Sequence, residues 1–259
     1  MYRFVLSRRW LGFALVMVVV ALGCVQLSEW QFHRQDAQRS SNAVIERNLA
    51  APPVDIAEVS AVGASVPAEL AWRTVRATGT FDESHQILVR YQHRDGQLGY
   101  DVITPLVTAG GPALLVDRGF VPANAATTVP DVPAPPRGPV RVTGWLRADQ
   151  SGDADQVRPQ SGQVRLVSSP AIAATLPYPA YGGYVEMTRA RPQPVVPLVG
   201  PEPPELGSGP HFFYGLQWLF FAALAVGGWV YLAWSEARTP RPAPVAGTDP
   251  PVREDATAR

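Results

Sequence analysis

The sequence predicts a membrane α+β protein, in which two transmembrane helices in a helical hairpin topology flank one external, mostly antiparallel β domain. Two apolar runs, 10–27 and 212–234, contain no charged side chain. Each is long enough to cross a hydrocarbon core of about 30 Å at a rise of ~1.5 Å per residue. Between them, short segments of partly alternating apolar and polar residues end at turn signals, which is typical of β-strands.

The charges at the chain ends predict the orientation. Arg3, Arg8 and Arg9 precede the first run without any acid, and Arg238 and Arg241 follow the second. Arginine is enriched on the cytoplasmic side of a span, so we expect a multi-pass protein of the plasma (cell) membrane with both termini cytoplasmic and its main domain on the outer face. The expected parts are a head (1–9), transmembrane helices (10–27 and 211–234), an external domain (28–210, with a helical entry at 28–49) and a disordered tail (235–259).

The first run also resembles a lipoprotein signal. Ala21-Leu22-Gly23-Cys24 follows an arginine-containing head and an apolar stretch, but the usual leucine three residues before the cysteine is alanine, and the run continues to Leu27. Lipidation at Cys24 therefore stays an alternative. Cys24 is the single cysteine, which excludes an intrachain disulfide and a cysteine-based metal cluster.

The composition argues against nucleic-acid binding. The chain has 259 residues and zero formal net charge, and all 22 basic residues are arginine. A nucleic-acid site needs a basic footprint, so no nucleic-acid partner is expected.

Residues 28–49 are expected to continue the first helix beyond the membrane. Trp30, Ala37 and Val44 recur at intervals of seven and form one narrow apolar stripe. Pro52 and Pro53 end this helix. A weaker helical stretch is expected at 55–70.

Residues 72–118 are predicted to form an antiparallel meander, and further strands are expected after the loop at 121–138. The expected strands are 72–81, 85–91, 99–106, 113–118, 140–147, 164–167 and 183–189, with a turn at Asp95-Gly96. A short helix at 169–176 is expected to be capped by Ser168 or Ser169. Segments 121–138 and 192–210 are rich in proline, and 148–163 is polar without periodicity, so all three are expected to lack regular structure.

No catalytic constellation is visible, so the chain is not expected to be an enzyme. It has no nucleophile elbow, phosphate loop, helix with paired metal ligands or paired carboxylates in an apolar setting. Asp117-Arg118-Gly119-Phe120 has two interpretations. It is either a functional loop or a strand end at which Arg118 pairs with a nearby acid.

His211 has the most unusual position, because it follows Gly209-Pro210 and opens the second run at the outer boundary. A helix N-terminus disfavours an imidazolium, and neutral imidazole is the form that binds haem iron. Aromatic residues that include Tyr214 and Trp218 follow and could pack on a porphyrin. The alternative is an interfacial histidine within an ordinary aromatic belt.

Trp30 and Arg34 lie at the outer end of the first run, four residues apart on one helix face. An arginine there could hold the carboxylates of a bound haem, because guanidinium makes bidentate bonds to carboxylates. The alternative is an interfacial tryptophan whose arginine stacks on it or reaches a lipid headgroup.

Six short motifs follow one another in a recognisable order. They are Glu29-Trp30-Gln31 with Arg34, Gly79-Thr80-Phe81, and the segments 99–106, 115–122, 142–147 and 211–218. Each is weak alone, but their order, with a span at each end, resembles the surfeit locus protein one family, the cytochrome c oxidase assembly factors. Only 148–180 matches poorly. Phe120 stands where the family usually has tryptophan, and Asp117 where it often has asparagine. The missing lysine and the proline-rich loops are typical of a high-GC actinobacterium.

The resemblance implies a chaperone role in the respiratory chain, in which the chain assists haem a delivery or insertion into subunit I of haem-copper cytochrome c oxidase. His211 would bind the iron of a transiently held haem a, with Trp30, Tyr214 and Trp218 beside the macrocycle and Arg34 or Arg118 on its propionates. The implied partners are cytochrome c oxidase subunit I, other oxidase or respiratory supercomplex subunits, and membrane lipid.

A structural role is the main alternative. A stable accessory or scaffold subunit of a respiratory oxidase complex, without haem binding, would co-purify with the mature oxidase in fixed ratio, whereas a transient factor would be largely absent from it. Copper delivery is not expected, because the external domain has no cysteine and no His/Met cluster.

Overall fold

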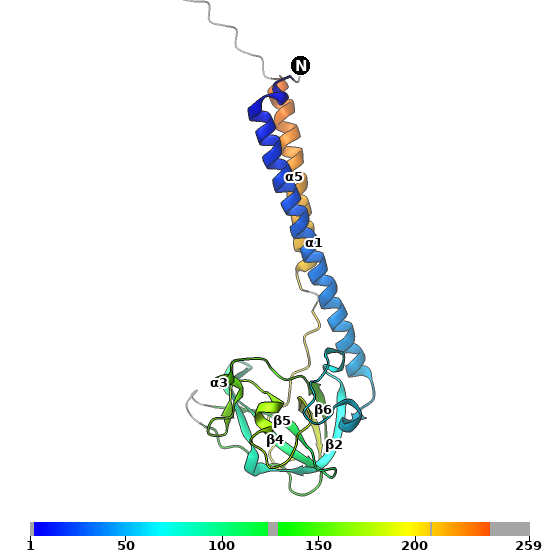
Figure 1. Ribbon diagram of the computed structural model, residues 1–259, viewed down its shortest axis with the longest axis vertical. Coiled ribbons are helices and arrows are strands. Elements are labelled where there is room, and N and C mark those ends of the chain that lie inside the picture. The colour runs from blue at the N-terminus through cyan, green and yellow to red at the C-terminus, as the bar shows by residue number, and fades with distance from the viewer. Residues whose placement is uncertain (1–2, 124–128, 208, 239–259) are drawn as a thin grey trace, which may run out of the picture. The chain divides into compact units, whose positions relative to one another are not determined.

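The computed structural model describes residues 3–123, 129–207 and 209–238, which fall into two compact units. The first unit comprises the described parts of Met1–Asp36 and Ser208–Arg259, and the second is Ala37–Gly207. Figure 1 shows the elements of both. The tail was predicted to be disordered from residue 235, but residues 235–238 are helical, and 239–259 lie outside the described residues.

Two long helices make up most of the first unit. A 3₁₀ turn, η1 (Arg3–Leu6), precedes α1 (Arg8–Ala50), and α5 (His211–Arg238) is the second helix. The most apolar windows of α1 and α5 have mean hydropathies of 2.3 and 1.6, so both helices are long and apolar enough to cross a membrane. The predicted continuation of the first helix to the residues before Pro52 is confirmed, since α1 ends at Ala50.

The two helices are antiparallel and lie side by side (Figure 1). The rings of Trp10 and Trp229 lie 6.2 Å apart, and Ser28 Oγ donates a 3.0 Å hydrogen bond to the carbonyl of Gly215. Less exposed positions on α1 recur in alternating steps of four and three: Trp10, Ala14, Met17, Ala21, Cys24, Ser28, Gln31 and Gln35. This is a coiled-coil seam, and its small residues let the helix backbones approach closely.

The stripe predicted on the helical entry does not form the packed face. Trp30 is 56% exposed and Ala37 is exposed, whereas Asn42 and Asn48 are buried. The amide of Asn42 donates to the carbonyls of Leu206 and Gly207, and that of Asn48 donates to the carbonyls of Glu69 and Ala71. The segments against this helix present carbonyls that need donors, and apolar periodicity does not detect such contacts.

The second unit is a β domain with short helical turns. Its strands are β1 (Val54–Asp55), β2 (Thr74–Phe81), β3 (Ile87–Arg94), β4 (Gln97–Thr108), β5 (Ala113–Pro122), β6 (Val140–Arg147), β7 (Gln163–Val164) and β8 (Tyr184–Arg191). Its helical turns are α2 (Ile56–Val59), η2 (Ala68–Leu70), η3 (Glu83–His85), α3 (Ala154–Val157) and α4 (Ser169–Ala173). The predicted weak helix at 55–70 is therefore two separate turns, and a helical turn interrupts the segment 148–163.

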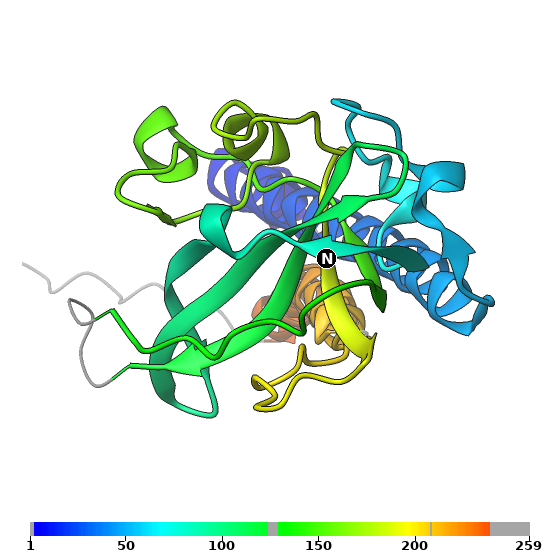
Figure 2. The same ribbon diagram turned by 90° about the horizontal axis from the view of Figure 1, so that it is seen from below.

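The strands close into a barrel (Figure 2). Their order is β1-β2-β6-β8-β5-β4-β3-β7, and a further pairing of β2 with β4 closes the ring. Only β3, β4 and β5 form the predicted meander. The expectation is wrong for β2, which pairs with β1, β4 and β6 rather than with β3. Strand β8 inserts between β6 and β5 and runs parallel to β5.

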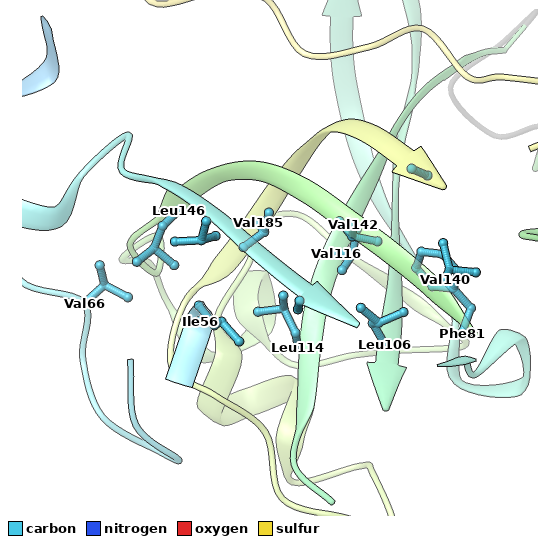
Figure 3. Packing of buried hydrophobic residues seen from close by; sticks show 13 residues of the cluster. Ile56, Val66, Phe81, Leu106, Leu114, Val116, Val140, Val142, Leu146 and Val185 are labelled. Atoms are coloured by element: carbon cyan, nitrogen blue, oxygen red, sulfur yellow. The ribbon is translucent and has the colours of Figure 1, made fainter. Parts of the chain in front are cut away.

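The barrel core is apolar and surrounds β5. Leu106, Leu114, Val116, Val142 and Val185 belong to one buried cluster (Figure 3). Leu115, on the other face of β5, belongs to a second buried cluster that includes residues of β7 and α4. Strand β5 is therefore buried on both faces, so a polar side chain on it is held away from water.

Two local predictions need correction. Strand β5 continues to Pro122, so Asp117-Arg118-Gly119-Phe120 is neither a loop nor a strand end. Helix α4 begins after Ser168, whose side chain makes no capping hydrogen bond. Ser169 Oγ instead donates to Asp149 and accepts from the backbone N–H of Gly183, because its buried position offers those partners.

Candidate functional site

His211 lies at the first residue of α5 and contacts α1. Its Nδ1 lies 2.9 Å from Oε1 of Gln31. An amide oxygen can only accept, so Nδ1 is the donor, and in the neutral imidazole Nε2 then keeps its lone pair. The structure gives Nε2 no hydrogen-bond partner among the described residues. A histidine that ligates a metal usually has this arrangement, with the second ring nitrogen donating to an oxygen that fixes the ring.

The backbone around His211 has little room for larger side chains. Gly209 has a φ of +62°, and a Cβ there would lie 3.1 Å from Cδ2 of the imidazole. On the next turn of α5, a Cβ on Gly215 would lie 2.7 Å from the ring of Phe32. The rings of Phe32 and Phe212 are 6.2 Å apart. The close approach of the helices therefore holds the His211–Gln31 pair in place.

The other predicted residues of this region are more exposed. Trp30 and Tyr214 are 56% and 47% exposed, Arg34 is exposed, and Trp218 is half-buried with its ring edge toward Phe221. Among the described residues, the structure joins only Gln31 to the imidazole by a hydrogen bond. The roles of Trp30, Tyr214 and Trp218 beside a porphyrin, and of Arg34 on its propionates, stay predictions.

Arg118 lies inside the β domain. Its side chain is buried, and its guanidinium donates to Oε1 of Gln86 at 3.0 Å and to the carbonyl of Pro133 at 2.6 Å. Burial lowers the pKa of Arg118 to about 10, and the charge of Glu83 opposes this. It forms no ion pair with an acid among the described residues, and its role toward a propionate stays a prediction.

A charged cavity of about 340 Å³, which was not predicted from the sequence, lies in the β domain. The strand register explains how distant acids gather there. Asp117 pairs with Glu186 across the parallel strands β5 and β8, and Asp101 of β4 lies near the bulge opposite Asp117. Asp117 shares the face of β5 that carries Leu115, which is the face away from the barrel core.

Two arginines pair with two of the four acids that line the cavity, which are Asp101, Asp117, Glu186 and Glu202. Arg94 lies 3.1 Å from Asp101, and Arg147 lies 3.2 Å from Glu186 while it stacks 3.8 Å above the ring of Trp72. Asp117 has no ion pair among the described residues, and its Oδ1 accepts the Gly119 N–H at 2.9 Å.

These surroundings shift the pKa values of Asp101, Asp117 and Glu186 to different extents. Burial raises the pKa of Asp101 and of Glu186, and the paired arginines oppose it. Burial also raises the pKa of Asp117 well above 3.8, and the carboxylate of Asp101 adds to the shift. Asp117 is therefore the acid of this cavity that holds its proton most strongly.

A further cluster contains the residue types of a hydrolase triad without its geometry. Nδ1 of His85 lies 2.7 Å from Oδ2 of Asp82 and 3.1 Å from Oγ of Ser84. In a triad the two imidazole nitrogens contact the acid and the nucleophile separately. Here one nitrogen faces both, so the imidazole cannot relay a proton between them.

The described residues contain no group of three or more His, Cys, Asp or Glu side chains able to hold a metal ion. A single histidine can ligate a metal that brings its other ligands with it, and haem iron is such a metal. His211 fits this role chemically.

The sequence model of the SURF1 family matches residues 18–223 of this chain. The chain belongs to the SURF1 family. Uncharacterised SURF1-like proteins of Mycobacterium tuberculosis and Mycobacterium bovis are each 32% identical to it over 252 residues, which cover 96% of this chain and 92% of the relative. A SURF1-like protein of Monosiga brevicollis is 29% identical over 162 residues, covering 57% of this chain and 59% of the relative.

Family membership confirms the resemblance seen in the motifs, and the mycobacterial relatives agree with the expected actinobacterial relationship. The SURF1 family generally comprises cytochrome oxidase assembly factors rather than enzymes. The residues matched by the family model include Gln31 and His211, whose side chains form a hydrogen bond between α1 and α5.

Proposed function

We propose that this chain is a membrane-bound assembly factor that assists the delivery or insertion of haem a into subunit I of haem-copper cytochrome c oxidase. Membership of the SURF1 family supports the assembly role. The observation that carries the haem role is the hydrogen bond between His211 and Gln31, which leaves Nε2 with a lone pair. Haem a is the cargo, and its iron supplies the redox centre of the oxidase after transfer.

The helix pair supports insertion in a membrane. Only 11% and 6% of the residues in the apolar windows of α1 and α5 are buried, so their outer faces have no protein partner among the described residues. Lipid is the environment in which such faces are stable. Arg8 and Arg9 at one end of α1, with Arg238 at the end of α5, favour cytoplasmic termini and an external β domain.

His211 would bind iron through Nε2, and Gln31 would hold the imidazole in the required tautomer and orientation. The exposed rings of Trp30 and Tyr214 offer apolar surface for a macrocycle, and Arg34 is free to reach a propionate. Arg118 is the weaker candidate for a propionate, because two acceptors inside the domain already hold its guanidinium.

The function is tested in cells that lack their own copy of this gene and receive variants of it. His211→Ala is expected to lower the amount of assembled oxidase at least tenfold, measured from the haem a band of isolated membranes, because the iron loses its protein ligand. Gln31→Leu is expected to lower it less than His211→Ala does, because the imidazole can still bind the iron after it loses the partner that orients it.

His33→Ala is the matched control, because His33 is an exposed histidine on the same helix. It is expected to support normal assembly, and immunoblots of all variants confirm equal protein levels. Normal assembly with His211→Ala, together with fixed-ratio co-purification of the wild-type chain with mature oxidase, would favour a scaffold subunit without haem binding.

A further inference from the structure

Tyr91 of β3 has a strained backbone and an exposed ring. Its φ is +63°, and the register between β3 and β4 shifts between Val89 and Gln92, which flank it. An aromatic residue rarely adopts this conformation, and such outliers gather at functional sites. The ring is 47% exposed, so burial of the ring does not account for the conformation.

Two arginines flank this ring. The guanidinium of Arg90 lies 5.2 Å from the ring centroid, and that of Arg165 lies 5.3 Å from it. Strands β3 and β7 pair in parallel with Val89 beside Val164, so the next residues along the two strands are these arginines. The backbone N–H of Arg165 also donates to the carbonyl of Gln156, which fixes its position.

The positive charge of this pair is uncompensated. Neither guanidinium forms an ion pair or a side-chain hydrogen bond with a described residue, although α3 carries Asp155 and begins after Asp153. Nε of Arg90 is buried and has no acceptor. A buried donor without an acceptor is costly, and two guanidinium groups beside one ring repel each other.

These groups line a concavity of about 390 Å³, bounded by Arg90, Tyr91, Gln92, Gln156, Arg165 and Leu166. Open space beside two unpaired guanidinium groups and a buried unsatisfied N–H suits an anion with several acceptor oxygens. A phosphate monoester matches best, because its two negative charges balance the two arginines and its oxygens accept from both.

We infer that Arg90, Tyr91 and Arg165 form a binding site for a phosphate group. Both guanidinium groups lie beside the Tyr91 ring, and the bulge sets the position of that ring. The phosphate belongs either to a small molecule or to a lipid headgroup. This site is separate from His211 and Gln31 in sequence and in chemistry, so it is tested without haem.

The test uses the full-length, haem-free protein in detergent at pH 7.5 and isothermal titration calorimetry with two probes. Inorganic phosphate represents the free source, and short-chain phosphatidic acid below its micelle concentration represents the lipid source. Saturable binding of either probe that weakens at least tenfold in the Arg90→Gln/Arg165→Gln double variant supports the site, and the probe bound more tightly identifies the source.

Arg141→Gln is the matched control, because Arg141 is an exposed strand arginine of the same domain, and it is expected to bind like wild type. Tyr91→Asn is the second variant, since asparagine adopts positive φ more readily. It is expected to keep or raise the unfolding temperature while binding the probe more weakly. Absence of saturable binding, or equal binding by the double variant, would overturn the inference.

Discussion

Replacing Asp117 by asparagine is expected to increase the free energy of unfolding at pH 8 by roughly 2 kcal/mol, the scale of an uncompensated buried charge. Asparagine has the same shape, and its Oδ1 can still accept the Gly119 N–H that Asp117 accepts at 2.9 Å. It removes a buried carboxyl that lies near Asp101 and Glu186 and has no ion pair among the described residues.

The sign of the pH dependence follows from the raised pKa of Asp117. In the unfolded chain this carboxyl loses its proton near pH 3.8, whereas in the folded domain burial and the Asp101 carboxylate hold the proton to a higher pH. Between those two values the folded state binds more protons, so the free energy of unfolding falls as pH rises. The advantage of Asp117→Asn should therefore shrink toward pH 4 and grow toward pH 8.

Urea unfolding of the full-length protein in detergent at several pH values, followed by tryptophan fluorescence, measures this difference. Asp95→Asn is the control, because Asp95 is an exposed turn residue with a φ of +51°, which asparagine tolerates. The control is expected to leave the pH dependence unchanged. A wild-type pH profile equal to that of Asp117→Asn would show that Asp117 is not a strained buried acid.

Gly119→Ala is expected to destabilise the protein by about 3 kcal/mol or more, through two separate effects. The φ of Gly119 is +126°, which L-residues rarely adopt, and a Cβ would lie 2.5 Å from the carbonyl oxygen of Val199. That oxygen accepts the N–H of Phe120, so the clash would also push away the segment at Val199. The nearby Pro201 lines the charged cavity, and the cavity would lose part of its wall.

Gly111→Ala separates the two effects, because Gly111 also has a positive φ (+97°) but a Cβ there would meet nothing within 4 Å. It is expected to cost only about 1–2 kcal/mol from the backbone conformation. The same urea titration compares the three proteins. Equal losses for the two variants would mean that the approach of Val199 to Gly119 is not close in solution.

Local patterns predicted most strands, because alternation and turn residues depend only on neighbours in the chain. The prediction 140–147 coincides with β6, and the Asp95-Gly96 turn joins β3 to β4. Insertion of β8 between β6 and β5 could not be predicted in this way. It depends on pairing between residues roughly 70 positions apart, such as Asp117 and Glu186.

In the candidate sites too, local sequence patterns predicted single residues but not the partners that the fold brings to them. His211 could be singled out from its position before an apolar run, but its partner could not, because Trp30 and Gln31 are neighbours that point in different directions on the helix. The cavity acids were missed because Asp101, Asp117 and Glu186 come from three strands. The one local signal was Asp117 after four consecutive apolar residues on a buried strand.

The proposed haem role depends on the ability of His211 to ligate the iron of haem a. The most direct test is the absorption spectrum of the detergent-purified protein, co-expressed with haem a synthesis, as wild type, His33→Ala and His211→Ala. We expect a red-shifted haem a band in the wild type and in His33→Ala, and loss of this band in His211→Ala. A wild-type protein without haem, or an undiminished band in His211→Ala, would contradict it.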